Sequence, residues 1–334
     1  MGTVLTYEHL YSGISIVLAI YFGKEEGKYI TKQGKNYAGH QRFLCKHCGV
    51  VFVSTKGTPL YRRKLSEQKI KNLCKELVEK KGIRAVERTT GIHRDTIGSY
   101  LSAFAEHAIS ISEYLTNDMD MSAYDADEFW SFVKKKQKKL KPNCGEEATS
   151  GDFWGYTIVK RKSFFFADFA LGKRTDTTCR LLFDNFKKHI KKPTPENNLE
   201  IFTDGNFGYE RVLPKYFDID SMDYGQLIKI KEKGRVVDKK KIIVFGNPDI
   251  SEIETTNVEC LNTILRNRLS RLVRQSQCHA KNKYKLNSAV ELFKFYWNFM
   301  KPLHGKVSPG MEENLTHKLW TWGNFLHTPR TFVN

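Results

Sequence analysis

The chain has 334 residues and a formal net charge of +18, with 40% hydrophobic and 13% aromatic residues. These values exclude a largely disordered chain and allow two or three domains with a sizeable core. A basic excess of this size favours a polyanionic partner, most often nucleic acid, although charge can also serve solubility alone. Seven cysteines, an odd number, favour a reducing intracellular setting.

An apolar run near the N-terminus, Tyr11–Phe22, fits either a strand or a short helix. Its most apolar part, Ile14–Phe22, is too short to span a bilayer, and the region lacks the charged start of a signal peptide. We therefore expect no attachment to a membrane.

A cysteine pair marks the first segment, 1–62. Cys45-Lys46-His47-Cys48-Gly49 lies between two apolar runs of β type, and its glycine permits a tight turn with two projecting thiolates. This pattern is one knuckle of a zinc ribbon, but no cysteine precedes Cys45 to form the second. His9 or His40 could supply a ligand, although a single histidine outside a motif is more often solvated. We expect an incomplete site and leave zinc at Cys45 and Cys48 open.

Residues 63–115 carry helical patterns. An apolar stripe at i, i+3, i+4 and i+7 is formed by Ile70, Leu73, Cys74 and Leu77. A short helix containing Ala85 follows, then a turn at Gly91 and a helix with a polar first turn. This spacing resembles a DNA-binding helix-turn-helix, and an ordinary helical hairpin is the alternative. Its recognition helix would present His93, Arg94, Thr96 and Ser99. A low-charge connector is expected over 108–121.

The sequence patterns of residues 116–310 predict a domain of strands and helices. A meander of three strands is expected at Ala123–Val133, Phe153–Val159 and Phe164–Leu171. An amphipathic helix over 179–190, capped at Thr175 or Asp176, comes next. A buried strand then runs from Leu199 into Thr203-Asp204-Gly205. This order fits an α/β fold with an RNase H-like core.

The second half of this domain is basic and then helical. A hairpin is predicted over Gln226–Val244, within a basic segment 226–246, because two apolar runs flank Lys233-Gly234. Its lysines would form a basic flap. Two helices, Thr256–Gln275 and the aromatic Leu286–Met300, follow, and 311–334 forms a C-terminal tail.

Three acids occupy related positions in these elements. Asp127 and Asp204 lie on predicted strands, and Glu259 lies near the start of the helix from Thr256. On that helix Glu259, Asn262 and Arg266 form a stripe beside the buried face. Each acid alone has an ordinary explanation, as a turn or a helical ion-pair partner. Together, two strand acids and a helix acid can converge on a pair of Mg²⁺ or Mn²⁺ ions, as phosphodiester cleavage requires.

These motifs resemble the DDE transposases of the insertion sequence one family. The resemblance covers roughly residues 40–325 and rests on the motifs Asp127 to Val133, Thr203-Asp204-Gly205, Glu259-x-x-Asn262-x-x-x-Arg266, Cys45-x-x-Cys48-Gly49, Phe295 to Pro302 and Leu315 to Trp322. It implies an RNase H-like catalytic domain with Asp127, Asp204 and Glu259 as metal ligands and catalytic residues, and Asn262 and Arg266 lining DNA.

The family also implies partners and a setting. The expected substrate is double-stranded DNA, with terminal inverted repeats as element ends, and the reaction is strand cleavage and transfer. The protein would act as a homo-oligomer on DNA, in the cytoplasm and associated with the nucleoid. The missing first knuckle and the long hairpin depart from the family pattern. A sequence-specific regulator without catalysis, or a nuclease or resolvase of the same fold, are the competing interpretations.

Overall fold

The computed structural model describes residues 30–37, 39–46, 49–140, 148–273, 275 and 277–330. The predicted element at Tyr11–Phe22, together with His9 and Cys48, lies outside the described residues. In the described part of the chain, no helix is both long and apolar enough to cross a membrane.

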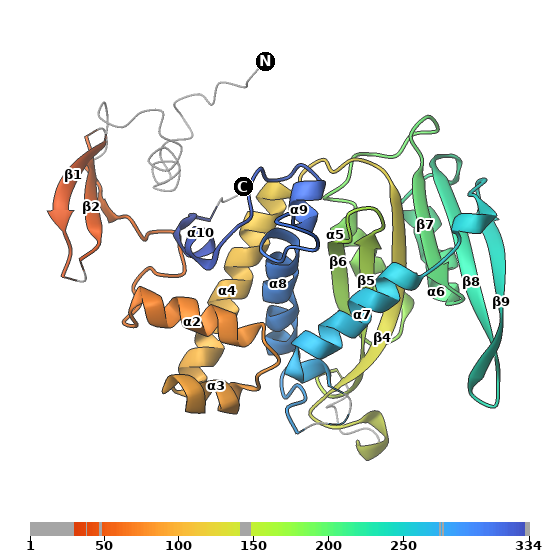
Figure 1. Ribbon diagram of the computed structural model, residues 1–334, viewed down its shortest axis with the longest axis horizontal. Coiled ribbons are helices and arrows are strands. Elements are labelled where there is room, and N and C mark those ends of the chain that lie inside the picture. Colours follow the sequence, from red (N-terminus) through yellow and green to blue (C-terminus); the bar gives the residue numbers. More distant parts are fainter. Residues whose placement is uncertain are drawn as a thin grey trace.

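A six-stranded mixed sheet occupies one end of the molecule, on the right in Figure 1. Its strands in chain order are β4 (Ala123–Val133), β5 (Gly151–Lys160), β6 (Phe165–Gly172), β7 (Leu199–Asp204), β8 (Met222–Glu232) and β9 (Arg235–Phe245). The spatial order is β6-β5-β4-β7-β8-β9, with β4, β7 and β8 parallel and the other pairs antiparallel. A mixed α/β fold is therefore confirmed, and this topology is consistent with the predicted RNase H-like core.

Helices cover the two faces of this sheet. The helix α5 (Asp176–Phe186) and the short α6 (Phe207–Val212) pack on one face, where Tyr124 of β4 meets Phe186 edge to face. The helix α7 (Thr256–Arg268) lies across β4 and β5 on the other face (Figure 1). Tyr124 and Ala126 face α5 and α6, whereas Asp125 and Asp127 face the α7 side, as strand alternation requires.

The helices near the N-terminus form a second layer that packs on the sheet through α8 (Lys283–Phe299). They are α2 (Glu67–Leu77), α3 (Ile83–Thr90) and α4 (Arg94–Leu115). α4 packs along α8, and α8 in turn contacts β6. Asn298 of α8 accepts from the backbone N–H of Phe166 and donates to its carbonyl oxygen, each at 2.9 Å, which satisfies the open edge of β6.

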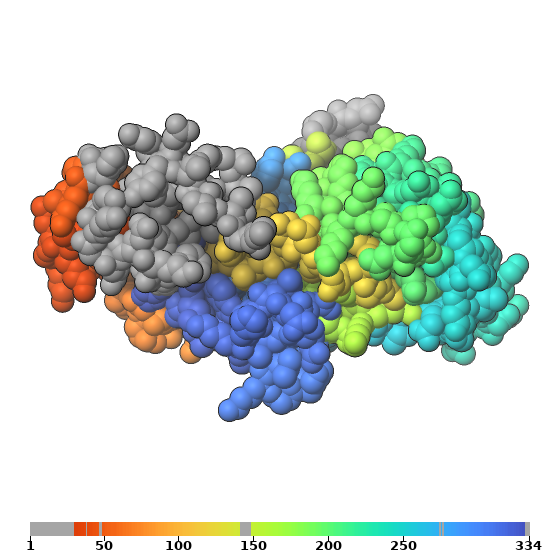
Figure 2. All heavy atoms as spheres, turned by 90° about the horizontal axis from the view of Figure 1, so that it is seen from above, coloured from red at the N-terminus to blue at the C-terminus, as the bar shows by residue number. Residues whose placement is uncertain are grey.

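The C-terminal segment is built into the fold. The helices α9 (Pro309–Glu312) and α10 (Trp322–His327) lie beside the N-terminal helices and the sheet domain, as the blue segment of Figure 2 shows. His107 of α4 donates from Nε2 to the Phe325 carbonyl oxygen at 2.8 Å. The residues 311–330 are therefore a docked part of the domain.

A separate three-stranded antiparallel sheet precedes these helices. It consists of β1 (Ile30–Lys35), β2 (Gln41–Cys45) and β3 (Val51–Val53). Phe43 and Phe52 stack at 5.7 Å in its small core. Its β2–β3 turn brings the Cys45 backbone N–H to the Val50 carbonyl oxygen at 3.0 Å.

Three predicted elements need correction. α4 continues to Leu115, through most of the expected connector 108–121, because its C-terminal part is buried against α8. α7 ends at Arg268, well before Gln275, because the Arg268 carbonyl oxygen accepts from the Lys80 backbone N–H at 2.8 Å and Leu269 turns to an extended conformation. The hairpin β8–β9 begins at Met222, four residues earlier than expected (226 − 222), because β8 pairs along the whole of β7.

Candidate active site

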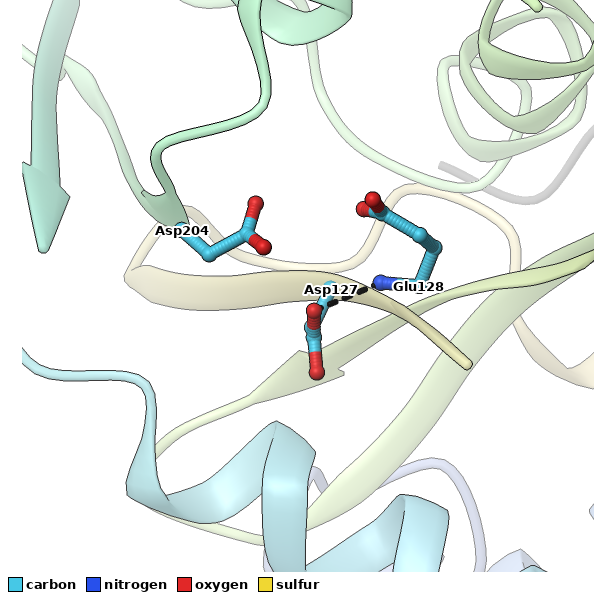
Figure 3. A group of neighbouring side chains, drawn as sticks. All are labelled: Asp127, Glu128 and Asp204. Carbon is cyan, nitrogen blue, oxygen red and sulfur yellow. Dashed lines mark hydrogen bonds between the residues drawn. The ribbon is translucent and has the colours of Figure 1, made fainter. Parts of the chain in front are cut away.

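The parallel pairing of β4 with β7 creates the acidic site. Ala126 pairs with Thr203, so the next residues, Asp127 in the middle of β4 and Asp204 at the end of β7, lie side by side on neighbouring strands. Glu128 follows Asp127 and joins the group. Carboxylate oxygens from these three residues all lie within 4.8 Å of one another. Figure 3 shows the side chains of Asp127 and Glu128 leaving β4 in opposite directions, with Asp204 on the adjacent strand.

Asp127 is oriented by two hydrogen bonds. One carboxylate oxygen, Oδ1, accepts from the backbone N–H of Glu128 at 2.7 Å, and Oδ2 accepts from the Asn262 side-chain nitrogen at 3.2 Å. Asn262 is itself fixed, because its Oδ1 accepts from the Thr157 hydroxyl at 2.8 Å. Asn262 is 3% exposed, so it faces the acid and the core.

Asp204 is held by the turn that follows β7. Its Oδ1 accepts from the Asn206 backbone N–H at 3.1 Å, and the Asn206 side chain donates to Glu128 Oε1 at 3.0 Å. Asn206 thereby ties the two strands together at the acidic group. It also caps α6, because its Oδ1 accepts from the Gly208 backbone N–H at 3.1 Å.

Glu128 carries a buried, incompletely satisfied carboxylate. Its side chain is 1% exposed. Oε1 accepts from Nε of Arg174 at 2.9 Å and also from Nη2, and the Arg174 guanidinium lies 4.6 Å over the Trp154 ring. Oε2 finds no hydrogen-bond partner in the described part of the chain. A buried carboxylate oxygen without a partner, within reach of two other carboxylates, fits a hard divalent cation.

The pKa values of Asp127 and Asp204 also indicate a site for a cation. Burial, followed by the nearby charges of Asp204 and Glu128, raises the pKa of Asp127 from 3.8 to about 7. Burial and the charge of Glu128 raise the pKa of Asp204 from 3.8 to about 6. The clustered negative charge is unfavourable without a cation, so this group could hold a metal ion.

Glu259 does not join this group. It lies in the first turn of α7, its side chain is 45% exposed, and it forms an ion pair with Lys229 of β8. The Thr255 hydroxyl also donates to Glu259 Oε1 at 2.9 Å. Burial raises the pKa of Glu259, but the contacts with Lys229 and Thr255 outweigh it, so the pKa is lowered. The structure thus brings Asp127 and Asp204 together and leaves Glu259 on a lysine.

Asp125 of β4 and Arg266 of α7 have structural partners within the protein. Asp125 accepts from Nε of Arg161 at 2.6 Å and is almost fully buried. Arg266 places its guanidinium 5.3 Å from the centre of the Phe129 ring. The predicted lining of DNA by Asn262 and Arg266 stays a prediction, since Asn262 faces Asp127 and Arg266 packs on an aromatic ring.

The predicted recognition residues lie at the start of α4. After α3, Gly91 adopts a left-handed conformation (φ 69°) and the chain turns into α4 at His93. All four residues are exposed: His93, Arg94, Thr96 and Ser99. Their contact with DNA stays a prediction. Cys45 ends β2, and because Cys48 lies outside the described residues, the zinc site also stays a prediction.

The hairpin β8–β9 presents a row of lysines on the α7 side. Lys229 pairs with Lys239, and Leu227 pairs with Lys241, so these residues share one face of the ribbon. Alternation along β8 adds Lys231 to that face. Lys240 pairs with Ile228 on the opposite face. The basic face is continuous with the ion pair at Glu259.

Three residues of this region were not predicted from the sequence: Glu128, Arg174 and Asn206. Lys229 was expected in the basic hairpin, but its ion pair with Glu259 was not. Glu128 had a signal, because it follows Asp127 directly, but strand alternation places it on the opposite face. The end of β7 reaches both faces through the turn at Asn206, and this unites the group. Arg174 carried no distinguishing pattern.

Comparisons with known proteins add little. No family model and no curated protein matches the chain. Among solved structures, the chain is similar to a crystal structure of the Mos1 strand transfer complex at 12% identity, over 48% of this chain and 58% of that chain, with a TM-score of 0.21. The chain thus covers less than two thirds of that structure, and a TM-score this low carries no argument about the fold or the function of this chain.

Proposed function

We propose that the chain is a DDE-type DNA transposase that cleaves and joins DNA strands with the help of Mg²⁺ or Mn²⁺. The observation that carries the proposal is the acidic group formed by Asp127 and Glu128 of β4 with Asp204 at the end of β7. The unpartnered Oε2 of Glu128 supports a cation there. The sequence resemblance to the insertion sequence one family supplies the reaction, and the six-stranded mixed sheet is consistent with the RNase H-like core that this family implies.

In this proposal each residue has a physical task. Asp127 and Asp204 hold the cations, Glu128 adds a carboxylate oxygen, and Glu259 closes the site from α7. Asn262 orients Asp127, and Arg174 with Asn206 orients Glu128. The bound cations supply activation of an attacking oxygen and stabilisation of the leaving oxygen. The lysine row of β8–β9 binds the phosphate backbone beside the site.

We propose further that the α3–α4 pair selects the DNA. The side chains of His93, Arg94, Thr96 and Ser99 are exposed at the start of a long helix, which suits entry into a major groove. The basic charge of the chain supports DNA as the partner. The helix pair is joined to the sheet domain through α8, which packs along α4 and contacts β6.

A strand-cleavage assay tests this proposal. The full chain is incubated with labelled duplexes from the ends of its own element and with target plasmid in Mg²⁺. Joined products are expected, whereas cutting without joining would indicate a nuclease or resolvase, and binding without cutting a regulator.

Isosteric variants connect the activity to the site. Asp127→Asn and Asp204→Asn remove ligand charge and are expected to abolish cutting while leaving end binding intact. Glu200→Gln is the matched control, because Glu200 lies on β7 outside the acidic group. Joining by both aspartate variants would overturn the proposal. The pair Glu128→Gln and Glu259→Gln then shows which glutamate the reaction requires.

A further inference from the structure

The ion pair between Lys229 and Glu259 links the basic hairpin to the helix above the acidic site. Lys229 lies on β8 and Glu259 in the first turn of α7. The lysine side chain is 27% exposed, and the Thr255 hydroxyl shares Glu259 Oε1 with it. This pair therefore fixes Glu259 at the border between protein and solvent.

The pair borders the acidic group from two directions. On the strand side, Asp204 pairs with Leu227, and Lys229 lies two residues further along β8 on the same face. On the helix side, Asn262 lies one turn after Glu259 and donates to Asp127. The charge of Lys229 also acts on Asp127 and Asp204, and it lowers the pKa of both against the larger effect of burial.

We propose that Lys229 is a positioning residue that acts as a tethered cation: it holds Glu259 away from Asp127 and Asp204 until a divalent cation displaces it. This inference rests on the proposed metal-dependent function. A divalent cation bound by Asp127, Asp204 and Glu259 carries more charge than the ammonium group of Lys229, so it can displace that group from Glu259. Binding of the cation then requires the ion pair with Lys229 to break. The protein would thus bind the cation more weakly than its carboxylates alone allow.

A phosphate group of DNA could become the partner of Lys229 once this lysine leaves Glu259. Lys229, Lys231, Lys239 and Lys241 share one face of the ribbon. A DNA backbone lying along this face would accept the released ammonium group as a phosphate contact. Cation binding and DNA binding would then favour each other, because both remove Lys229 from Glu259.

Binding of Mn²⁺ to the full chain without DNA tests the proposal directly. Free Mn²⁺ is counted by electron paramagnetic resonance in a titration at fixed salt. Lys229→Met is expected to tighten binding at least fivefold, whereas Lys229→Arg stays near the wild type because it keeps the ion pair. Lys231→Met is the matched control, since it removes the same charge from the same face of the same strand, and it should change the affinity less than twofold.

The double variant Lys229→Met/Glu259→Gln isolates the pair. If Lys229 acts through Glu259, most of the tightening disappears in the Glu259→Gln background. Equal tightening by Lys229→Met and Lys231→Met would mean that only long-range charge matters and would overturn the inference. So would an unchanged affinity in Lys229→Met while Asp204→Asn still abolishes binding, although the proposed metal site would then stand. Failure of Asp204→Asn to weaken Mn²⁺ binding would instead remove the metal site on which the inference rests.

Discussion

The side-chain nitrogen of Asn262 donates to Oδ2 of Asp127 at 3.2 Å, although 135 residues separate the two. This bond joins α7 to β4 at the acidic group. Thr157 on β5 donates to the amide oxygen of Asn262, so the amide nitrogen must point at the acid. Three elements thus determine the direction of one carboxylate oxygen.

Asn262→Ala is expected to leave Asp127 in place but free to rotate. Loss of such an orienting partner typically lowers metal affinity or activity 10–100-fold, and we expect a loss of that order in Mn²⁺ affinity. Asn267→Ala is the matched control, because Asn267 lies exposed on the same helix. Titration of both variants with Mn²⁺ measures the effect. If the two variants bind alike, the orienting role assigned to Asn262 is wrong.

Arg94→Ala tests the recognition helix. Base-edge contacts carry sequence discrimination, so the variant should lose affinity for the cognate end by about 1–3 kcal/mol and lose much less on random duplex. Arg84→Ala, at an exposed position on α3, is the control. Competition binding with both duplexes gives the comparison. Equal losses on cognate and random DNA would leave Arg94 as a phosphate contact only.

The lysine face of β8–β9 predicts that the salt dependence of DNA affinity comes from one face of the hairpin and not from the other. If Lys231 contacts a phosphate, Lys231→Gln should reduce the slope of log K against log salt by about 0.9. Lys240→Gln removes the same charge from the opposite face and should change the slope less. Filter binding over a range of salt concentrations gives both slopes. Equal slopes for the two variants would show that DNA does not follow this face.

The strands of the six-stranded sheet could be predicted from sequence because alternation and apolar runs are local signals. The predicted strand Ala123–Val133 has the bounds of β4, and the acid after the buried run Ile201–Phe202 ends β7 as expected. The ends of α4 and α7 could not be predicted. They depend on burial against α8 and on the bond from Lys80 to Arg268, which no local pattern encodes.

For the candidate site, too, the acids on the strands could be predicted, whereas their contacts with distant residues could not. Asp127 and Asp204 meet because the register of the parallel strands β4 and β7 places them side by side. The contacts of Glu128 with Arg174 and Asn206 join residues 46 and 78 positions apart, and Lys229 meets Glu259 across 30 positions. Such pairs follow from the register of β8 and the path of the turn after β7, which only the folded structure defines. The roles of Asp127, Asp204 and Glu259 in catalysis stay predictions.

The raised pKa values of Asp127 and Asp204 predict how stability depends on pH without divalent cations. In the unfolded chain both acids ionise near their ordinary value of 3.8, whereas in the folded chain they ionise near 7 and 6. The folded state therefore holds protons that the unfolded state has released. Their contribution to the free energy of unfolding is fully present below pH 3.8 and is lost as the pH rises through the folded values.

A neutral amide at position 127 removes the contribution of Asp127 to this dependence. Asp127→Asn is expected to unfold a few degrees above the wild type at pH 8 in EDTA, and to differ little from it at pH 4.5. Mg²⁺ should raise the melting temperature of the wild type at pH 8 and leave that of the variant unchanged, because binding to the folded state alone stabilises it. Circular dichroism melts of the wild type and the variant at the two pH values, with and without Mg²⁺, give the melting temperatures for these comparisons.

The comparison with Asp127→Asn is needed because another group acts in the opposite direction. Burial lowers the pKa of His107 from 6.5 to about 3, so its contribution to stability falls as the pH drops below 6.5. Wild-type melts alone would mix this loss with the gain from Asp127 and Asp204. Subtracting the result for the variant from that for the wild type cancels His107, which both proteins share, and leaves the contribution of Asp127. A difference that does not grow from pH 4.5 to pH 8 would mean that Asp127 is not held at a raised pKa, and the charge argument for a cation at this site would fail.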